Sequence, residues 1–188
     1  MQNDIVLTMR GICKYFPGVK ALENVDFTLR KGTIHALMGE NGAGKSTLIK
    51  VLTGVYPMDA GEIRIEGIDH AVVIHSPQEA QSFGISTVYQ EITLCPNLSV
   101  AENMFIGRSG GRGVDWKAME RRAGELLDSL GIPARPRQQL SSCSLAVQQM
   151  VASARAVDTE CKVLILDEPT SSLDDKEVDM LFTLMRGL

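Results

Sequence analysis

The sequence has none of the long apolar runs that mark a membrane-spanning protein. Across its 188 residues no uninterrupted apolar stretch exceeds four, and residues 163–166 are an example of that length. A helix that crosses a bilayer needs about 20 mainly apolar residues, so the pattern predicts no such helix. Residues 1–4 lack the basic and apolar blocks of a secretory leader, and we therefore expect no leader.

Close cysteine pairs and an excess of basic charge are also missing. The four cysteines, Cys13, Cys95, Cys143 and Cys161, lack the short spacing of a zinc site, and we interpret them as reduced packing residues. Lys and Arg together number 19 against 23 Asp and Glu, for a formal net charge of -4. That balance argues against a general nucleic-acid binder, which needs positive charge to neutralise phosphates.

The sequence does contain the composition and patterning of a folded α/β chain. Hydrophobic residues make up 44% and charged residues 22%, as in ordinary globular proteins. Short apolar or alternating segments predict strands over residues 5–9, 25–29, 33–38, 62–66 and 162–166. Helical periodicity predicts helices over residues 45–52 and 119–130, from Ser144 onward and from about Asp174. Helices dominate residues 97–157, which predicts an α/β domain with an inserted helical subdomain.

The most informative segment is a glycine-rich loop between a predicted strand and a predicted helix. It reads Gly39, Glu40, Asn41, Gly42, Ala43, Gly44, Lys45, Ser46 and Thr47, which fits the P-loop pattern. Glycines let successive backbone N–H groups turn toward phosphate oxygens, and the following helix adds its positive dipole end. We expect Lys45 to reach the β- and γ-phosphates and the Ser46 hydroxyl to bind Mg²⁺. The alternative is a glycine-rich turn with a solvated lysine.

Two acidic residues follow the apolar segment at residues 162–166. Asp167 stands where a buried strand would leave the carboxyl edge of a parallel sheet, and ligands bind at that edge. We therefore expect Asp167 to help hold the magnesium ion and Glu168 to polarise the attacking water. The alternative is a surface Asp-Glu pair before a proline turn.

Together these motifs resemble those of ATP-binding cassette (ABC) transporter ATPases. Residues 39–47 carry the resemblance, as does the stretch 166–174, which resembles the Walker B strand, the catalytic glutamate and the D-loop with its Asp174. Gln90 lies where the family has its Q-loop glutamine, which senses magnesium and attacking water; alone it would be a surface polar residue. The resemblance also implies an aromatic residue that stacks on adenine. Spacing favours Phe16, with Tyr15 second, and a packing aromatic is the alternative.

The resemblance extends over all 188 residues and implies the fold class. That class is α/β: a P-loop NTPase (RecA-like) core with an N-terminal antiparallel β-subdomain and an inserted α-helical subdomain. The expected division is a β-subdomain and P-loop core over 1–96 and a helical subdomain over 97–157. Residues 158–188 would then hold the Walker B strand, the D-loop and the start of the following helix.

On segments 16–22, 39–45 and 100–108 the chain resembles the monosaccharide-importer branch of the family. Within that branch, the region of Ser144 and residues 162–166 resemble galactofuranose-importer ATPases. Two departures stand out. Residues 143–147 replace the family's usual Leu-Ser-Gly-Gly-Gln signature. Ser144 is kept, and we expect it to cap the following helix. Both glycines are lost, so bulkier side chains would crowd a phosphate that approaches this helix. No histidine follows Glu168, where the family has its switch histidine. We therefore expect a first cassette that is truncated before its last core strands.

The resemblance implies an ATP-hydrolysing subunit that uses ATP and Mg²⁺ to drive sugar uptake. Its implied partners are integral-membrane permease subunits, a second cassette and, indirectly, a periplasmic or extracellular sugar-binding protein, with no nucleic acid. The implied location is peripheral, at the cytoplasmic face of the inner membrane. The alternatives are a soluble ABC ATPase without a permease, such as a translation or repair factor, and a non-catalytic nucleotide sensor. Basic residues at 108, 112, 117, 121 and 122 are interpreted as a solvated face.

Overall fold

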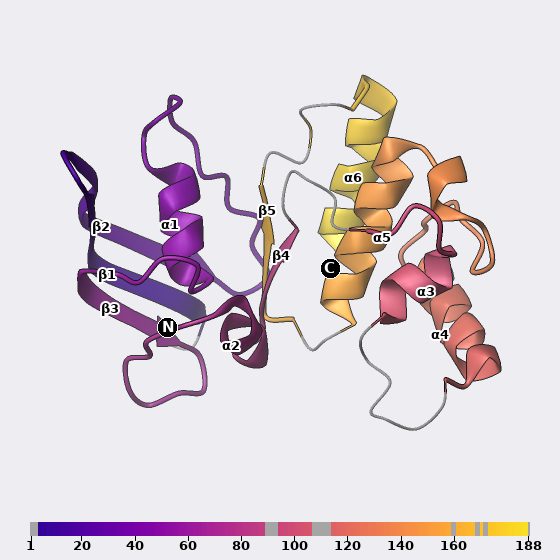
Figure 1. Cartoon of the computed structure of the whole chain (residues 1–188), viewed down its shortest axis with the longest axis horizontal. Helices are drawn as coiled ribbons and strands as arrows, with labels where there is room; N and C mark the ends of the chain where they lie inside the picture. The colour runs from indigo at the N-terminus through magenta and orange to yellow at the C-terminus, as the bar shows by residue number, and fades with distance from the viewer. Residues whose placement is uncertain are drawn as a thin grey trace. The chain divides into compact units, whose positions relative to one another are not determined.

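The computed structural model describes residues 4–88, 94–106, 114–158, 161–167, 170 and 173–187 (Figure 1). Its contacts divide the chain into two compact units. Unit 1 comprises residues 1–86 with 161–165, and unit 2 comprises residues 87–160 with 166–188. Within the described ranges, no helix has both the length and the apolar character needed to cross a membrane.

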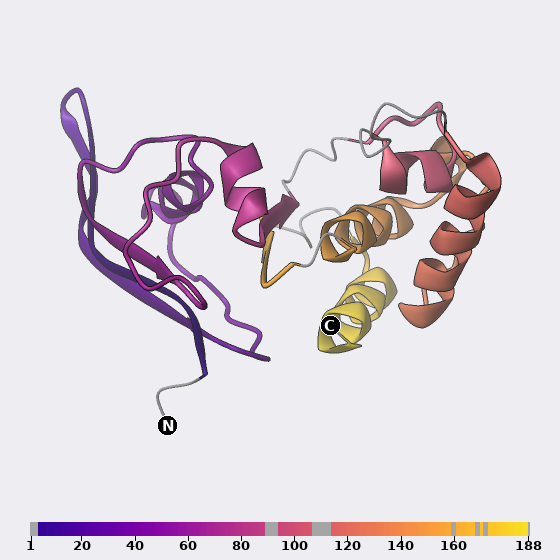
Figure 2. The ribbon, with the colours of Figure 1, turned by 90° about the horizontal axis from the view of Figure 1, so that it is seen from below.

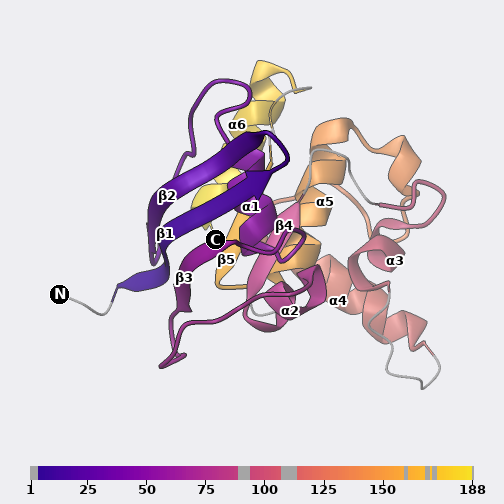
Figure 3. The same cartoon turned by 60° about the vertical axis from the view of Figure 1, so that its left-hand side comes forward.

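Unit 1 contains a three-stranded antiparallel sheet. Strand β1 (Ile5–Phe16) is central and pairs with β2 (Val19–Arg30) on one side and β3 (Ala60–Ile65) on the other (Figure 3). Apolar side chains of β1 and β3 are buried together, so one face of the sheet is a core surface. A tight turn at Pro17 and Gly18 joins β1 to β2, and the φ of 77° at Gly18 suits glycine. The strands predicted at 5–9, 25–29 and 62–66 are confirmed.

Helix α1 (Lys45–Leu52) lies over one face of this sheet (Figures 1 and 2). It buries Leu48, Val51 and Leu52 in the core that β1 and β3 form. The helix ends at its C-cap, Thr53, and the next residue, Gly54, has a φ of 70°, which suits glycine after a helix. A short helix, α2 (Pro77–Ser82), follows β3 and is capped by Ser76, whose side chain accepts a hydrogen bond from the Glu79 N–H. The sequence analysis missed α2.

Unit 2 is built from helices, as the pattern over residues 97–157 predicts. Its helices are α3 (Val100–Phe105), α4 (Trp116–Ser129), α5 (Leu145–Val157) and α6 (Asp175–Gly187), with a 3₁₀ turn, η1 (Leu140–Ser142), before α5. Helix α5 packs against the other three helices of the unit. Helical periodicity from Ser144 onward predicts that Val147, Met150, Val151 and Ala154 face inward, and all four are buried in one apolar core. The periodicity therefore identified the correct face of this helix.

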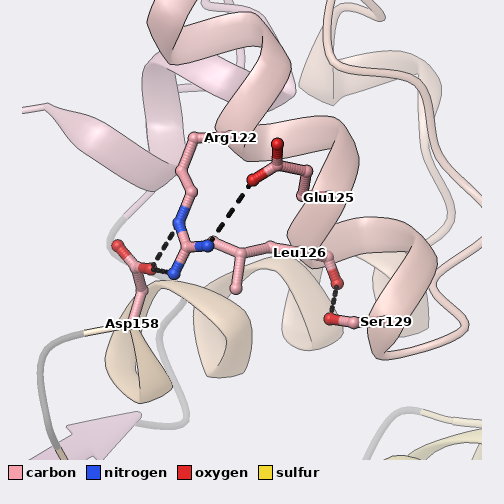
Figure 4. A network of polar contacts seen from close by, with 5 residues as sticks. All are labelled: Arg122, Glu125, Leu126, Ser129 and Asp158. Atoms are coloured by element: carbon pink, nitrogen blue, oxygen red, sulfur yellow. Dashed lines mark hydrogen bonds and ion pairs between the residues drawn. The ribbon is translucent and has the colours of Figure 1, made fainter.

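A polar contact fixes α4 to the end of α5 (Figure 4). The Arg122 Nη2 lies 2.9 Å from Asp158 Oδ1, and its Nη1 lies 3.6 Å from Glu125 Oε2. Because Arg122 remains about half exposed, such pairs stabilise the fold by at most about 1 kcal/mol. Arg122 is thus solvated, as predicted for the basic segment, but it is paired as well. Of that segment, Arg108 and Arg112 lie outside the described residues.

Strands β4 (Ile85–Val88) and β5 (Val163–Leu166) form a separate two-stranded sheet. The Val163 N–H donates to the Gly84 carbonyl, and the Asp167 N–H donates to the Val88 carbonyl. Both strands advance together along this ladder, so they are parallel. This confirms the strand predicted at 162–166, whereas β4 was not predicted.

The strand predicted at residues 33–38 is wrong. The described structure assigns residues 33–40 to no regular element, and Ile34, Leu37 and Met38 are 54%, 40% and 87% exposed. A strand is stabilised by a neighbour that takes its backbone hydrogen bonds. Within the described ranges, no strand pairs with this segment, so its apolar pattern alone does not produce a strand.

The entry into α3 provides a test of stability against pH. The Glu102 carboxylate accepts hydrogen bonds from the Ser99 N–H (2.7 Å) and hydroxyl (2.6 Å), which lower the pKa of Glu102 below its usual value. A lowered folded-state pKa stabilises the fold above the usual pKa, and this contribution is lost as pH falls through the lowered value. Replacing Glu102 by Gln should therefore cost most stability near neutral pH and less toward about pH 3.

Urea unfolding of the wild type and Glu102→Gln across this pH range measures the difference. Ser99→Ala serves as the matched control, because it removes the hydroxyl partner and should flatten the pH dependence of the Glu102 substitution. A cost of Glu102→Gln that is constant with pH would contradict the assignment.

Candidate nucleotide-binding site

The glycine-rich loop at residues 39–47 lies in unit 1 and leads directly into α1. Gly42 and Gly44 have φ angles of 86° and 88°, in the left-handed region that glycine adopts without strain. The Ala43 N–H donates to the Glu40 carbonyl across 3.1 Å, which closes a turn inside the loop. Alternating backbone conformations of this kind make concave N–H surfaces that suit anions.

Gly44 is the residue that seats the loop on the sheet. A Cβ atom at this position would lie 2.6 Å from the Ala21 carbonyl oxygen and 2.9 Å from Leu22 Cδ2, both on β2. Only a residue without a side chain therefore fits between the loop and β2. Gly44 is also the N-cap of α1 and offers no capping side chain, so the first-turn N–H groups are available to a bound anion.

Lys45 folds back over the loop that precedes it. Its ammonium donates to the Gly39 carbonyl at 2.7 Å and to the Glu40 carbonyl at 3.0 Å. This places a positive charge beside the loop and next to the positive end of the α1 dipole. The neighbouring Ser46 is exposed and Thr47 is half-buried. The loop therefore combines amides, a helix end and an ammonium, which is the chemistry that binds a polyphosphate.

Phe16, the predicted adenine-stacking residue, ends β1 within the same unit. Its ring makes an edge-to-face contact with Tyr56, with centroids 5.2 Å apart, and the Lys14 Nζ lies 5.5 Å from its centroid. Tyr15, the second candidate, is the preceding residue of the strand and is 44% exposed. A hydrogen bond with the Cys13 side chain raises the pKa of Tyr15. Sequence reasoning missed Lys14 and Tyr56 because no motif marks them.

Asp167 belongs to unit 2 and directly follows β5. Its N–H continues the β4–β5 ladder through the Val88 carbonyl, at 3.1 Å, so the residue leaves the sheet at the carboxyl end of β5, as predicted. Glu168 and Gln90, the other two predicted residues of the hydrolytic chemistry, lie outside the described residues. The roles of all three stay predictions.

Ser144 begins α5 as its N-cap. Its hydroxyl accepts a hydrogen bond from the Val147 N–H at 3.4 Å, which confirms the predicted cap. Of the two residues at the lost glycine positions, Ala146 is 1% exposed and faces the core, whereas Leu145 is 39% exposed. Crowding of a phosphate at this helix end would therefore come from Leu145 and not from Ala146.

Asp174 has a local structural role in unit 2. Its carboxylate accepts the Glu177 N–H at 2.9 Å, and the Glu177 carboxylate accepts the Asp174 N–H at 3.3 Å. This reciprocal pair caps the start of α6. The Asp-x-x-Glu spacing of residues 174–177 was not used above to predict this cap, although it could have identified it.

The comparisons with known proteins identify relatives that are named as ATP-binding proteins of sugar transport or import. The galactofuranose transporter ATP-binding protein YtfR of Escherichia coli (strain K12) is 56% identical over 100% of this chain, and the fructose import ATP-binding protein FruK of Bifidobacterium longum is 53% identical over 98%. The chain spans 37% and 36% of the lengths of these two relatives.

Two solved structures are similar to the chain. The ADP conformation of MJ1267, an ATP-binding cassette of an ABC transporter, has a TM-score of 0.82 at 25% identity, covering 97% of this chain and 77% of that one. The structure of cbiO1 from Clostridium perfringens, part of the ABC transporter complex cbiONQ, has a TM-score of 0.81 at 26% identity, covering 97% of this chain and 73% of that one. These likenesses confirm the P-loop NTPase fold.

A family model described as ABC transporter matches residues 22–171, which include the glycine-rich loop, Asp167 and Ser144. This match extends over most of the chain. The chain therefore belongs to the ABC transporter family, as one of its ATP-binding cassettes.

Proposed function

We propose that this chain binds and hydrolyses ATP to drive the import of a monosaccharide through a separate membrane permease. The observation that carries the proposal is the loop of residues 39–47, with left-handed Gly42 and Gly44 and the Lys45 ammonium folded over it. The relatives named for galactofuranose and fructose transport support sugar as the class of cargo.

The loop supplies the phosphate-binding part of the reaction. When a triphosphate binds, the Lys45 ammonium would donate to its charged oxygens in place of the neutral Gly39 and Glu40 carbonyls. The first-turn N–H groups of α1 add donors along the same phosphate chain. Lys45 would then stabilise the charge that develops on the transferred phosphoryl group.

The residues proposed for magnesium have the oxygen donors that this ion prefers. The Ser46 hydroxyl and the Asp167 carboxylate are hard ligands, and Gln90 adds an amide oxygen. Among the described residues no three His, Cys, Asp or Glu side chains cluster as a metal site. At nucleotide sites Mg²⁺ usually takes one or two carboxylates together with phosphate oxygens of the substrate. When bound, Mg²⁺ neutralises phosphate charge. Glu168 orients and polarises the attacking water.

The start of α5 would face the nucleotide of a second cassette. Ser144 caps this helix, so its positive dipole end is formed. The exposed Leu145 replaces a glycine and reduces the room for a phosphate there, which supports a weaker composite site and the assignment as a first cassette. Asp174 lies at the start of α6, where we place a further contact to the second cassette.

The proposed partners follow from import through a permease. They are the integral-membrane permease subunits, a second cassette and, indirectly, a sugar-binding protein outside the membrane; nucleic acid is not among them. The proposed location is peripheral, at the cytoplasmic face of the inner membrane. The division into a β-subdomain and P-loop core over 1–96, a helical subdomain over 97–157 and a Walker B segment over 158–188 is part of the proposal.

Replacing Lys45 by Ala should weaken ATP binding by about 10-fold or more, because it removes charge-assisted hydrogen bonds to phosphate. Calorimetric titration of the chain with ATP measures the effect. Lys31→Ala is the matched control, since Lys31 is an exposed lysine of the same unit that lies 3.8 Å from Glu66. Equal affinities of the Lys45 variant and the wild type would contradict the P-loop assignment.

Replacing Glu168 by Gln should leave ATP binding intact and slow turnover by about 10²- to 10⁴-fold, because the amide does not polarise water as a carboxylate does. The release of phosphate from ATP, measured with the full-length protein, gives the turnover. The exposed Glu23→Gln is the control for removal of one charge. Wild-type turnover of the Glu168 variant would remove this residue from the chemistry.

A further inference from the structure

Unit 1 places two lysines, a tyrosine and an aspartate around Phe16, and no motif in the sequence accounts for these four residues. We call Lys14, Phe16, Lys50, Tyr56 and Asp59 the ring cluster. The rings of Phe16 and Tyr56 meet edge to face at 5.2 Å with an interplanar angle of 76°. Lys14 lies 5.5 Å from the Phe16 centroid, and Lys50 lies 5.4 Å from the Tyr56 centroid.

We propose that Tyr56 is a positioning residue that holds the Phe16 ring as the platform for adenine, with Lys14 anchoring the same ring. The proposal rests on the proposed function, because it requires Phe16 to stack on the base of a bound nucleotide. It concerns how this chain fixes the orientation of that ring.

Lys14 is held in place by charge and burial. The residue is 7% exposed, and its ammonium lies 3.1 Å from the Asp59 carboxylate. Asp59 also accepts the Tyr15 N–H at 2.6 Å, so the carboxylate is fixed to the β1 backbone. At 5.5 Å from the Phe16 centroid, the ammonium lies within the range at which an aromatic ring attracts a cation. Phe16 itself stays half-buried, so part of its surface is open to a ligand.

Tyr56 connects Phe16 to the helix that starts at the phosphate loop. The Tyr56 N–H donates to the Lys50 carbonyl at 3.0 Å, and the Val55 N–H donates to the same carbonyl at 2.9 Å. These bonds tie the segment to the last turn of α1, whose first residue is Lys45. Phe16 is therefore supported by the element that carries the phosphate-binding lysine, which sets the base platform relative to the loop.

This connection predicts that a change at Tyr56 weakens binding of the nucleotide base but not binding of the phosphates. Tyr56→Leu removes the aromatic partner of Phe16 but leaves the loop at residues 39–47 unchanged. Aromatic pairs contribute enough to predict about a 3- to 10-fold loss of ATP affinity. Affinity for inorganic tripolyphosphate, which has no base, should change by less than about 2-fold.

The experiment compares ATP and tripolyphosphate binding by calorimetry in the wild type, Tyr56→Leu, Tyr56→Phe and Phe16→Leu. The proposal expects Tyr56→Phe to keep wild-type ATP affinity, because it keeps the ring. It also expects the double variant Phe16→Leu/Tyr56→Leu to lose no more than Phe16→Leu alone, because both changes act on one platform.

Unchanged ATP affinity in Tyr56→Leu would overturn the positioning role, and so would a parallel loss of both ligands or a failure of Tyr56→Phe to keep affinity. If the wild type bound neither ligand, the proposed function would fail and the inference would fall with it. A different outcome would be that the wild type binds tripolyphosphate and Phe16→Leu keeps wild-type ATP affinity. That outcome would refute only the role of Phe16 as the adenine platform and would leave phosphate binding by the loop standing.

Discussion

The proposed nucleotide site depends on the close packing of the glycine-rich loop at residues 39–47 against β2. Gly44 lies where a Cβ would come within 2.6 Å of the Ala21 carbonyl oxygen, so the loop reaches the strand only because this residue has no side chain. Its left-handed backbone also starts α1 without a capping side chain. Lys45 then folds its ammonium over the loop. Sheet, loop, helix end and charge are thereby fixed in one unit.

In the same unit, α1 connects the glycine-rich loop to Phe16, the proposed adenine-stacking residue. The helix begins with Lys45 at the loop, and Tyr56 is hydrogen-bonded to its last turn and contacts Phe16. In unit 2, the relevant feature is how two of its helices begin. Its helices α5 and α6 both begin at capped ends, through Ser144 and through the reciprocal pair of Asp174 and Glu177.

Local features of the sequence predicted much of this arrangement. The P-loop pattern, the start of α1 at Lys45 and the Ser144 cap depend on residues within a few positions of each other, and all three are present. Features that depend on distant partners were not predictable in the same way. The segment at 33–38 has the apolar pattern of a strand, but strand formation depends on a neighbour that the pattern does not specify. The Lys14–Asp59 ion pair joins residues far apart in the sequence, and no sequence motif predicts it.

If the loop at residues 39–47 holds the phosphates of a nucleotide, its backbone amides should respond when ATP is added. Amide ¹H–¹⁵N spectra of the chain, recorded during a titration with ATP, measure this response. The largest shifts should fall on the backbone amides of residues 42–47, and inorganic tripolyphosphate should shift the same amides. Nucleotide-induced shifts confined to other parts of the chain, or no shifts at all, would show that the loop does not bind the phosphates.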